Sequence, residues 1–286
     1  MVEIKKLCLK TEASGLLAGP FNFTLLTNKL NLILGSNGSG KSFLAYYFLD
    51  LDDKKYLNCR TKTSDPLFPE VYLLTQNAIL QFTAATVEEE FFSLETINDI
   101  SEVKKFLETM RCEALLNKNI LHLSSGERQK IALCLAAASN KPIIIMDQPD
   151  SNLDERSIAD MQQLISDMLK LNKTIVIMTT TLNNFSSITD GENIVELSKD
   201  PSLMRYPDDT QEIIFPKIPS KNSKPYENTL TFKNLTIKRD SSVLIEGCQG
   251  IIRKGSFFKL SGDNGSGKST LLLFFAGLLK DKASQI

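Results

Sequence analysis

The stretch Gly35-Ser36-Asn37-Gly38-Ser39-Gly40-Lys41-Ser42 follows an apolar run at residues 30–34 and precedes a helical pattern. It has the spacing G-x-x-x-x-G-K-[ST] of a phosphate-binding loop, in which glycines let successive backbone N–H groups converge on phosphate oxygens at a helix N-terminus. In such a loop the Lys41 ammonium reaches the β- and γ-phosphates, and the Ser42 hydroxyl is a ligand of Mg²⁺. The sequence therefore predicts a nucleotide site at the end of a buried strand.

A second copy of this loop occurs near the other end of the chain. The stretch Gly262-Asp263-Asn264-Gly265-Ser266-Gly267-Lys268-Ser269-Thr270 lies at a constant offset from the first copy, and an apolar strand pattern at residues 257–260 precedes it. Residues 230–238 also echo residues 2–10. We expect the second loop to bind nucleotide phosphates too, with Ser269 as the Mg²⁺ ligand. The matches indicate an internal repeat of domain length.

The repeat predicts three parts of the chain. Residues 1–198 are expected to form a complete nucleotide-binding domain, and residues 229–286 the opening of a second one that lacks the strands flanking its loop. Residues 199–228 are rich in proline, lysine and serine and read as a linker with one short strand at residues 212–215. We therefore expect a tandem protein that is truncated, or a fragment of one.

Composition and charge narrow the classes of function. The 286 residues include 33 Lys and Arg against 34 Asp and Glu, a formal charge of −1 that gives no electrostatic reason to expect a nucleic-acid partner. Five scattered cysteines favour reduced, buried thiols over a disulfide framework or a zinc cluster, and with them a cytosolic compartment. No signal peptide is visible, and the longest apolar run, residues 271–279, is too short to span a bilayer. Membrane association is therefore expected only through a partner.

Hydrophobic periodicity predicts strands alternating with helices. Strands are expected at residues 2–10, 21–26, 30–34, 71–74, 143–147 and 174–178. Helices are expected at residues 42–51, 88–94, 101–116, 124–138 and 157–171. The run Ile143–Asp147, which is apolar up to a final carboxylate, suits a central parallel strand beside the phosphate loop. The alternation predicts an α/β sheet covered by helices on both faces.

Four further motifs follow the first loop, and together they resemble those of the ATP-binding cassette (ABC) ATPases across residues 1 to about 200. Gln76 is similar to the Q-loop glutamine, and Ile143–Asp147 to the Walker B strand. The stretch Leu123-Ser124-Ser125-Gly126-Glu127-Arg128-Gln129 resembles the Leu-Ser-Gly-Gly-Gln signature, with serine in place of one glycine, and Ser151-Asn152-Leu153-Asp154 resembles the D-loop. The resemblance implies an α/β P-loop NTPase fold of ABC type: a mostly parallel sheet, an antiparallel β subdomain and a helical signature subdomain.

A narrower resemblance surrounds the Q-loop. Residues 72–90 are similar to the Gln-Asn-Pro-x-x-Gln-Leu-Phe…Thr-Val-x-Glu-Glu pattern of energy-coupling factor ATPases, which energise vitamin and metal-ion importers. The Gln-Asn pair, Gln81, the Thr-Val pair at 86–87 and the Glu-Glu pair at 88–89 are kept, whereas Ala78 replaces the proline. The spacing of Glu127 and Gln129 also fits this subfamily. The alternative is a generic ABC cassette.

The resemblance implies roles for these residues in binding ATP and Mg²⁺. In the family, two domains sandwich two ATP molecules, and each site joins one domain's P-loop and Walker B strand to the other's signature. Ser42 and Asp147 would hold Mg²⁺, which Gln76 would sense. The signature residues from Ser124 to Glu127 would complete the site built on Lys268.

Two positions on the catalytic face depart from the family pattern. Gln148 stands where a glutamate usually follows the Walker B aspartate, and an amide can position water but cannot act as a general base. Thr180, or by spacing Thr181, stands where the switch histidine is expected, and the chain's single histidine, His122, adjoins the signature instead. We expect the site on Lys41 to bind Mg-ATP and hydrolyse it slowly; neutral drift at Gln148 in an active enzyme is the alternative.

A third departure concerns the adenine base. The aromatic residue that normally stacks on adenine near the end of the first strand aligns with Thr11 in the first domain and Arg239 in the second. The base is therefore expected to be held loosely, or by an aromatic residue from elsewhere.

The resemblance implies a transport ATPase that is peripheral on the cytoplasmic face of the cell membrane. The segment from Gln76 to Leu94 would dock an integral membrane subunit, with Phe82, Phe91 and Phe92 either as anchors or as core of the helical subdomain. A soluble tandem ABC protein acting on ribosomes or nucleic acid is a second possibility, which the proline-broken and weakly basic linker disfavours. A third is an ATP-binding module that does not hydrolyse. The second ABC domain, in cis or in trans, is the other expected partner.

Overall fold

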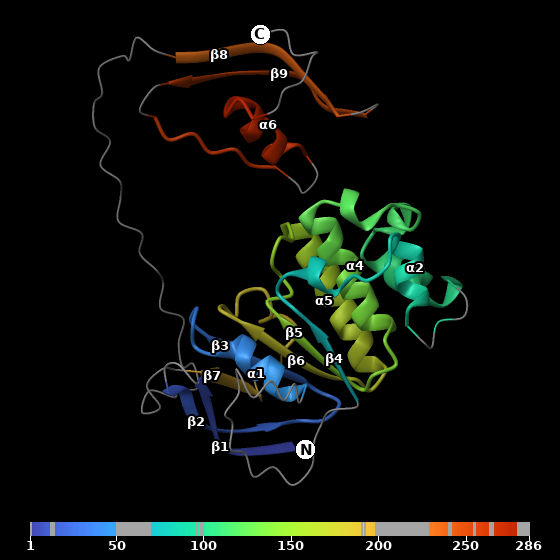
Figure 1. Cartoon of the computed structure of the whole chain (residues 1–286), viewed down its shortest axis with the longest axis vertical. Coiled ribbons are helices and arrows are strands. Elements are labelled where there is room, and N and C mark those ends of the chain that lie inside the picture. The colour runs from blue at the N-terminus through green and yellow to red at the C-terminus, as the bar shows by residue number, and fades with distance from the viewer. Residues whose placement is uncertain are drawn as a thin grey trace. The chain divides into compact units, whose positions relative to one another are not determined.

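The computed structural model describes residues 2–11, 15–49, 70–94, 97, 100–189, 191, 193–197, 229–239, 242–253, 256–262 and 266–278. The chain forms two compact units, Met1–Thr210 and Gln211–Ile286, each with its own apolar core (Figure 1). The linker at residues 199–228, with the strand expected at residues 212–215, lies outside the described residues.

The first unit is built on a parallel sheet of five strands in the order β4-β5-β6-β3-β7. The strands are β3 (Leu30–Gly35), β4 (Val71–Leu74), β5 (Ile143–Asp147), β6 (Thr174–Thr179) and β7 (Ile194–Leu197). In the register, Leu34 pairs with Thr179 and Asp147 pairs with Met178. The carboxyl ends of β3, β5 and β6 therefore meet at one edge of the sheet, where the phosphate loop begins.

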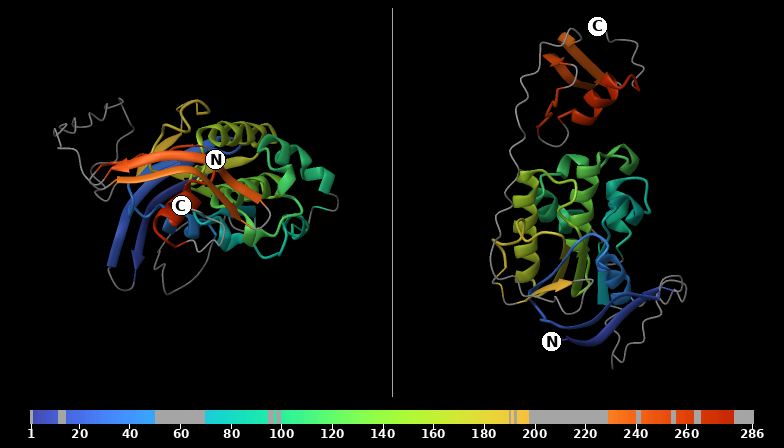
Figure 2. Two further views of the ribbon diagram at one scale, coloured as in Figure 1. Left: turned by 90° about the horizontal axis from the view of Figure 1, so that it is seen from above. Right: turned by 90° about the vertical axis from the view of Figure 1, so that its left-hand side faces the viewer.

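Alternate residues of these strands pack into two separate cores, because successive side chains of a strand point to opposite faces. Helices α4 (Ser125–Ala138) and α5 (Glu155–Lys170) bury one face, and α1 (Lys41–Phe48) buries the other. Leu32 and Ile144 belong to the first core, whereas Ile33 and Ile145 belong to the second. The predicted sheet with both faces covered is confirmed (Figure 2).

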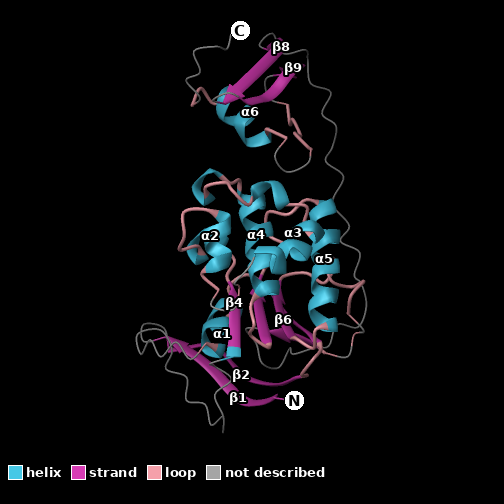
Figure 3. Cartoon of the chain, turned by 90° about the vertical axis from the view of Figure 1, so that its right-hand side faces the viewer, coloured by secondary structure: helices cyan, strands magenta, loops and turns pink. Residues whose placement is uncertain are grey.

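Two smaller parts complete the first unit. An antiparallel hairpin, β1 (Val2–Thr11) and β2 (Gly15–Leu25), contributes Phe21 and Phe23 to the core under α1. A helical subdomain precedes α4 along the chain. It consists of η2 (Ala78–Gln81), α2 (Val87–Phe92), η3 (Ile100–Val103), α3 (Lys104–Thr109), η4 (Glu113–Leu115) and η5 (Ile120–His122). Figure 3 shows these helices on the side of the sheet away from the hairpin, as the predicted ABC-type fold requires.

One predicted helix is wrong. Residues 101–116 were expected to form a single helix, but the segment consists of η3, α3 and η4, and the chain turns between α3 and η4 at Arg111, whose φ is 53°. The left-handed conformation cannot continue a right-handed helix. The Arg111 guanidinium reaches the Asp160 carboxylate of α5 at 3.0 Å, a tertiary contact that local periodicity does not reveal.

The second unit contains an antiparallel hairpin, β8 (Thr229–Arg239) and β9 (Ser242–Arg253), and the helix α6 (Lys268–Phe275). Leu235, Ile237 and Leu271 form its small core. The strand predicted at residues 257–260 does not form, and the Phe257 side chain is 94% exposed. A strand needs a neighbour for its backbone groups, and the described residues of this unit provide none beside residues 257–260.

Two expectations from composition can be checked within the described residues. None of their helices has the length and apolar character needed to cross a membrane. Cys112 and Cys134 are free and buried, as predicted, with their sulfur atoms 3.8 Å apart, whereas Cys248 is free but only partly buried.

Candidate functional site

The first phosphate loop joins the end of β3 to the first residue of α1. Gly38 and Gly40 have φ values of 76° and 99°, which glycine adopts without the steric cost of a Cβ. Ser36, Asn37 and Gly38 lie exposed on the rim of the loop, whereas Ser39, Gly40 and Lys41 are buried. The loop is thus a curved backbone with exposed N–H-bearing residues on its rim and a cation beneath them.

Lys41 is held inside this curve. Its Nζ donates to Gly35 O at 2.6 Å and to Ser36 O at 3.0 Å. Burial lowers the pKa of Lys41, and the negative charge of Asp147 opposes that shift. The ammonium therefore lies against the loop carbonyls, near where phosphate oxygens would bind.

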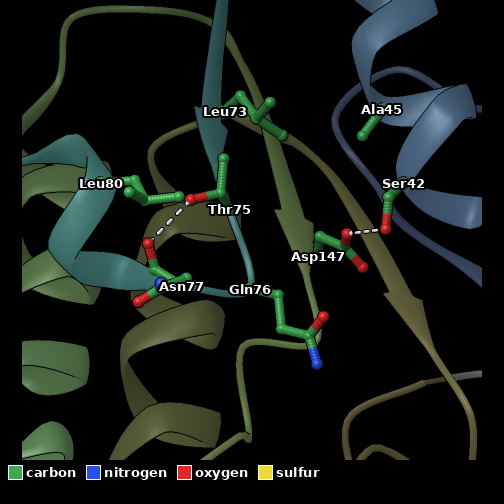
Figure 4. Close-up of a pocket in the computed structure, with 8 residues that line it drawn as sticks. All are labelled: Ser42, Ala45, Leu73, Thr75, Gln76, Asn77, Leu80 and Asp147. Carbon is green, nitrogen blue, oxygen red and sulfur yellow. Dashed lines mark hydrogen bonds between the residues drawn. The ribbon is translucent and has the colours of Figure 1, made fainter.

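Ser42 and Asp147 meet directly at the edge of the sheet. Ser42 Oγ donates to Asp147 Oδ2 at 2.6 Å (Figure 4). Burial raises the pKa of Asp147, and the hydrogen bond from Ser42 and the charge of Lys41 oppose that rise. Asp147 Oδ1 is buried and has no hydrogen-bond partner in the part of the chain that the structure describes. A hydroxyl and a carboxylate with one unsatisfied oxygen are the hard donors that Mg²⁺ prefers, so these residues fit the ion.

Gln76 and Gln148 face each other beside this pair. Gln76 Nε2 donates to Gln148 Oε1 at 3.0 Å, and Gln148 N donates to Met178 O of β6 at 2.8 Å. Gln148 is in the left-handed region, with φ of 50°. A cleft of about 170 Å³ opens next to Gln76; its lining residues are Ser42, Ala45, Leu73, Thr75, Gln76, Asn77, Leu80 and Asp147. The structure thus brings four predicted residues together: Ser42, Gln76, Asp147 and Gln148.

Thr180 follows the last residue of β6 and is exposed. Its neighbours are tied locally, because Thr179 Oγ1 donates to Thr181 O at 3.2 Å and accepts from Thr181 N at 3.4 Å. Since Met178 pairs with Asp147, Thr180 lies at the same edge of the sheet as Ser42 and Asp147.

The predicted signature starts α4. Ser124 is the N-cap, and a reciprocal capping box links it to Glu127: Ser124 N donates to Glu127 Oε2 at 2.8 Å, and Glu127 N donates to Ser124 Oγ at 3.2 Å. Burial favours a higher pKa for Glu127, but the hydrogen bonds from Ser124 and the charge of Lys118 outweigh it, so the pKa lies below its ordinary value. Ser125 is exposed and Gly126 is buried.

Asp154 of the D-loop is the N-cap of α5, where its Oδ1 accepts from Ser157 N at 2.8 Å. His122 is exposed. The second loop follows the same plan as far as it is described: Lys268 starts α6 and its Nζ donates to Gly262 O at 2.6 Å. Asp263, Asn264 and Gly265 lie outside the described residues, while Ser266, Gly267, Ser269 and Thr270 stand at the start of α6.

The segment from Gln76 to Leu94 presents a mixed surface. Phe91 is fully buried and is a core residue, not an anchor, whereas Phe92 is 45% exposed. Leu80 is 76% exposed, and the sequence pattern had not singled it out. Beneath them the buried Glu90 carboxylate accepts from Thr83 N at 2.8 Å and from Ala84 N at 2.7 Å.

Two side-chain contacts near the site were not predicted from the sequence. Gln129 Nε2, buried in α4, donates to Pro149 O at 2.9 Å, and Asn184 Nδ2 donates to Asp150 Oδ2 at 2.8 Å. Both hold the turn that follows β5. Their partners are 20 and 34 residues away in sequence, so no local pattern could have identified these contacts.

Comparison with known proteins gives consistent matches. The family model described as ABC transporter matches residues 19–151. An energy-coupling factor transporter ATP-binding protein, EcfA, of Onion yellows phytoplasma (strain OY-M) is 31% identical over 193 residues, which cover 62% of this chain and 69% of that protein. A Bacillus subtilis (strain 168) protein described as an HMP/thiamine import ATP-binding protein is 25% identical over an alignment covering 93% of this chain and 59% of its own length.

Solved structures agree on the fold. The structure of cbiO1 from Clostridium perfringens, described as part of the ABC transporter complex cbiONQ, has a TM-score of 0.56 at 18% identity and covers 69% of this chain and 84% of that one. For three of the curated relatives, this chain spans only 66%, 59% and 42% of their length.

Proposed function

This chain belongs to the ATP-binding proteins of ABC transporters, in the energy-coupling factor subfamily, and from that membership we propose that it binds Mg-ATP and couples ATP binding and hydrolysis to an integral membrane partner. The proposal places it on the cytoplasmic face of the membrane, held there by that partner. Import is the proposed direction, because the curated relatives include import proteins.

The observation that carries the ATP-binding part is the convergence of three groups at one edge of the sheet. The Lys41 ammonium lies inside the loop, the Ser42 hydroxyl contacts Asp147, and Asp147 Oδ1 is buried without a partner among the described residues. Cation, hydroxyl and carboxylate thus meet where exposed loop residues can donate N–H groups to phosphate.

Each residue has a chemical task in this proposal. Lys41 moves from the loop carbonyls to the β- and γ-phosphates, and the exposed rim of the loop donates N–H groups to the same oxygens. Ser42 and Asp147 would hold Mg²⁺, and Gln76 beside them would sense it. When bound, Mg²⁺ neutralises charge on the phosphate oxygens. Gln148 orients water but cannot take its proton.

We further propose that the site on Lys41 turns over slowly. Gln148 supplies an amide in place of a base, and Thr180 supplies a hydroxyl in place of an imidazole. A positioned general base contributes about 10²- to 10⁴-fold in rate, so its absence is sufficient to slow hydrolysis.

The membrane partner is proposed to dock on the segment from Gln76 to Leu94. Leu80 and Phe92 are its exposed apolar side chains, and Leu80 also lines the cleft beside Gln76. A partner seated there would sense the position of the Q-loop.

The proposed ATP-binding site is tested by calorimetry, which measures how the full chain binds a non-hydrolysable ATP analogue with Mg²⁺. Lys41→Ala should weaken binding at its site by about 10-fold or more, because a charge-assisted contact to phosphate is lost. The assay is run in a Lys268→Ala background so that only the first site is read. Lys170→Ala, which removes an exposed lysine of α5, is the matched control. Equal binding by the variant and the control would contradict the proposed site.

Membrane docking is tested separately by co-purification with solubilised membrane proteins. Leu80→Asp should reduce recovery of the membrane partner, whereas Leu171→Asp, at an exposed leucine after α5, should not. Equal recovery with both variants would contradict docking at this segment.

A further inference from the structure

The turn after β5 holds a residue in an uncommon conformation. Gln148 has φ of 50°, in the left-handed region that residues with a Cβ rarely adopt, and Pro149 follows it directly. Such residues persist only where surrounding contacts determine their conformation. The side chain so placed is the one that accepts from Gln76 and stands at the catalytic position.

Contacts from three separate elements fix this turn. Met178 O of β6 accepts from Gln148 N at 2.8 Å, and Asn184 Nδ2 reaches the Asp150 carboxylate at 2.8 Å. The third contact comes from α4: Gln129 Nε2 donates to Pro149 O at 2.9 Å. Within the turn itself, Ser151 N donates to Gln148 O at 3.0 Å.

The contact from Gln129 differs from the others because it comes from the signature helix, α4. Gln129 is only 1% exposed and lies in the second turn of α4, the helix whose first turn is the signature from Ser124 to Glu127. Its hydrogen bond therefore joins the signature helix directly to the residue after Gln148. A buried carbonyl such as Pro149 O loses a hydrogen bond that water cannot replace if this amide is removed.

We infer that Gln129 is a positioning residue: its side-chain amide fixes the turn that presents Gln148 and transmits nucleotide occupancy at the Lys41 loop to the signature end of α4. The part of the inference that concerns transmission rests on the proposed Mg-ATP site, whereas the part that concerns the turn does not. The route runs from Asp147 through Gln148 and Pro149 to Gln129, and from there along one helical turn to Ser124.

Gln129→Glu tests the contact with minimal change in shape. The substitution replaces the donating NH₂ with an oxygen, so an acceptor faces the Pro149 carbonyl. Hydrogen exchange of the nucleotide-free full chain should rise about 10-fold at the amides of Gln148 and Ser151, a factor that corresponds to the loss of one buried hydrogen bond. Gln163→Glu, on the exposed face of α5, is the matched control and should leave these amides unchanged. Unchanged exchange at Gln148 and Ser151 in Gln129→Glu would overturn the inference.

The transmission arm adds Mg-ATP. In the unaltered chain, binding should slow exchange in residues 123–128, and in Gln129→Glu this response should be lost while the Kd for Mg-ATP changes by less than about threefold. A merely structural role would instead raise exchange throughout α4 and leave the response to Mg-ATP in place, which would also overturn the inference.

Two further arms keep the outcome unambiguous. If Gln129→Glu does not fold, Gln129→Met, which keeps the volume and removes the donor, replaces it in both measurements. If the unaltered chain fails to bind Mg-ATP, the proposed function fails, and the nucleotide-free exchange at Gln148 and Ser151 still decides whether Gln129 holds the turn.

Discussion

Replacing Gln148 by Glu tests directly why the first site is proposed to be slow. The change exchanges an amide nitrogen for an oxygen, so Gln76 Nε2, which donates to Gln148 Oε1 at 3.0 Å, keeps an acceptor. The backbone bond from Gln148 N to Met178 O is unaffected. The new carboxylate can accept a proton from the attacking water, which is worth about 10²- to 10⁴-fold. Because residue 148 is partly exposed and its carboxylate is solvated, we expect a gain in kcat near the lower end, about 100-fold.

The same substitution should make turnover sensitive to acid. Burial already raises the pKa of Asp147, against the opposing hydrogen bond from Ser42 and the charge of Lys41. A second carboxylate beside it raises that pKa further, because like charges disfavour ionisation. Since the proton of the attacking water must go to the carboxylate introduced at residue 148, turnover of Gln148→Glu should fall as pH decreases through the pKa of that carboxylate, which the negative charge of Asp147 raises in turn.

The assay is phosphate release by the full chain at saturating Mg-ATP, in a Lys268→Ala background. It is run over a range of chain concentrations, because a site of this family is completed by the signature of a second domain. Gln163→Glu adds the same charge on α5 and should not change the rate. A gain below about threefold, with the Kd for Mg-ATP unchanged, would refute the reasoning and direct attention to Thr180.

Three further predictions concern stability. Asn31→Leu should cost about 3 kcal/mol or more in urea unfolding, because its buried amide makes five hydrogen bonds, one of them to Ile175 O of β6; a cost below about 1 kcal/mol would contradict this. Ser124→Ala should cost about 1 kcal/mol in thermal unfolding followed by circular dichroism through the lost N-cap, and an unchanged midpoint would show that the cap is dispensable. Burial lowers the pKa of Lys173 to about 8, below its unfolded value, so the unfolded chain binds the extra proton above that pH and this residue's contribution to stability rises with pH. Relative to Lys173→Met, the unaltered chain should gain about 2 kcal/mol between about pH 7.5 and about pH 9.5 in urea unfolding; parallel pH profiles would refute the assignment.

Four of the five strands of the first unit's sheet were predictable because they are largely apolar runs. β4 begins and ends where the hydrophobicity does, β5 extends one residue further to Asp147, and the phosphate loop fixes where β3 must end. β7 was missed: it is only four residues long, like β4, but the charged Glu196 interrupts its apolar run. Its place beside β3 comes from pairing Ile194 with Leu32, across more than half of the chain.

The residue types of the site could be predicted from their spacing, whereas their arrangement around the turn after β5 could not. The resemblance to the ABC ATPases implied that Ser42 and Asp147 share an ion, and their side chains do meet. The left-handed conformation of Gln148 and its anchor Gln129 depend on contacts between elements. Conformation of this kind is set by tertiary packing, so it leaves no periodic trace in the sequence.

The lysine that closes the first loop also affects how a ligand would enter it. Lys41 Nζ already donates to Gly35 O and Ser36 O, so in the nucleotide-free loop these two carbonyl oxygens take the place that phosphate oxygens would occupy around the ammonium. An arriving phosphate therefore exchanges one set of polar contacts for another and does not have to organise a flexible glycine-rich chain. The affinity of the loop for phosphate then depends on how much more strongly the Lys41 ammonium binds phosphate oxygens than it binds the two carbonyl oxygens. Anions too small to displace both carbonyls should bind weakly there, a selection by size that arises before any contact with base or sugar.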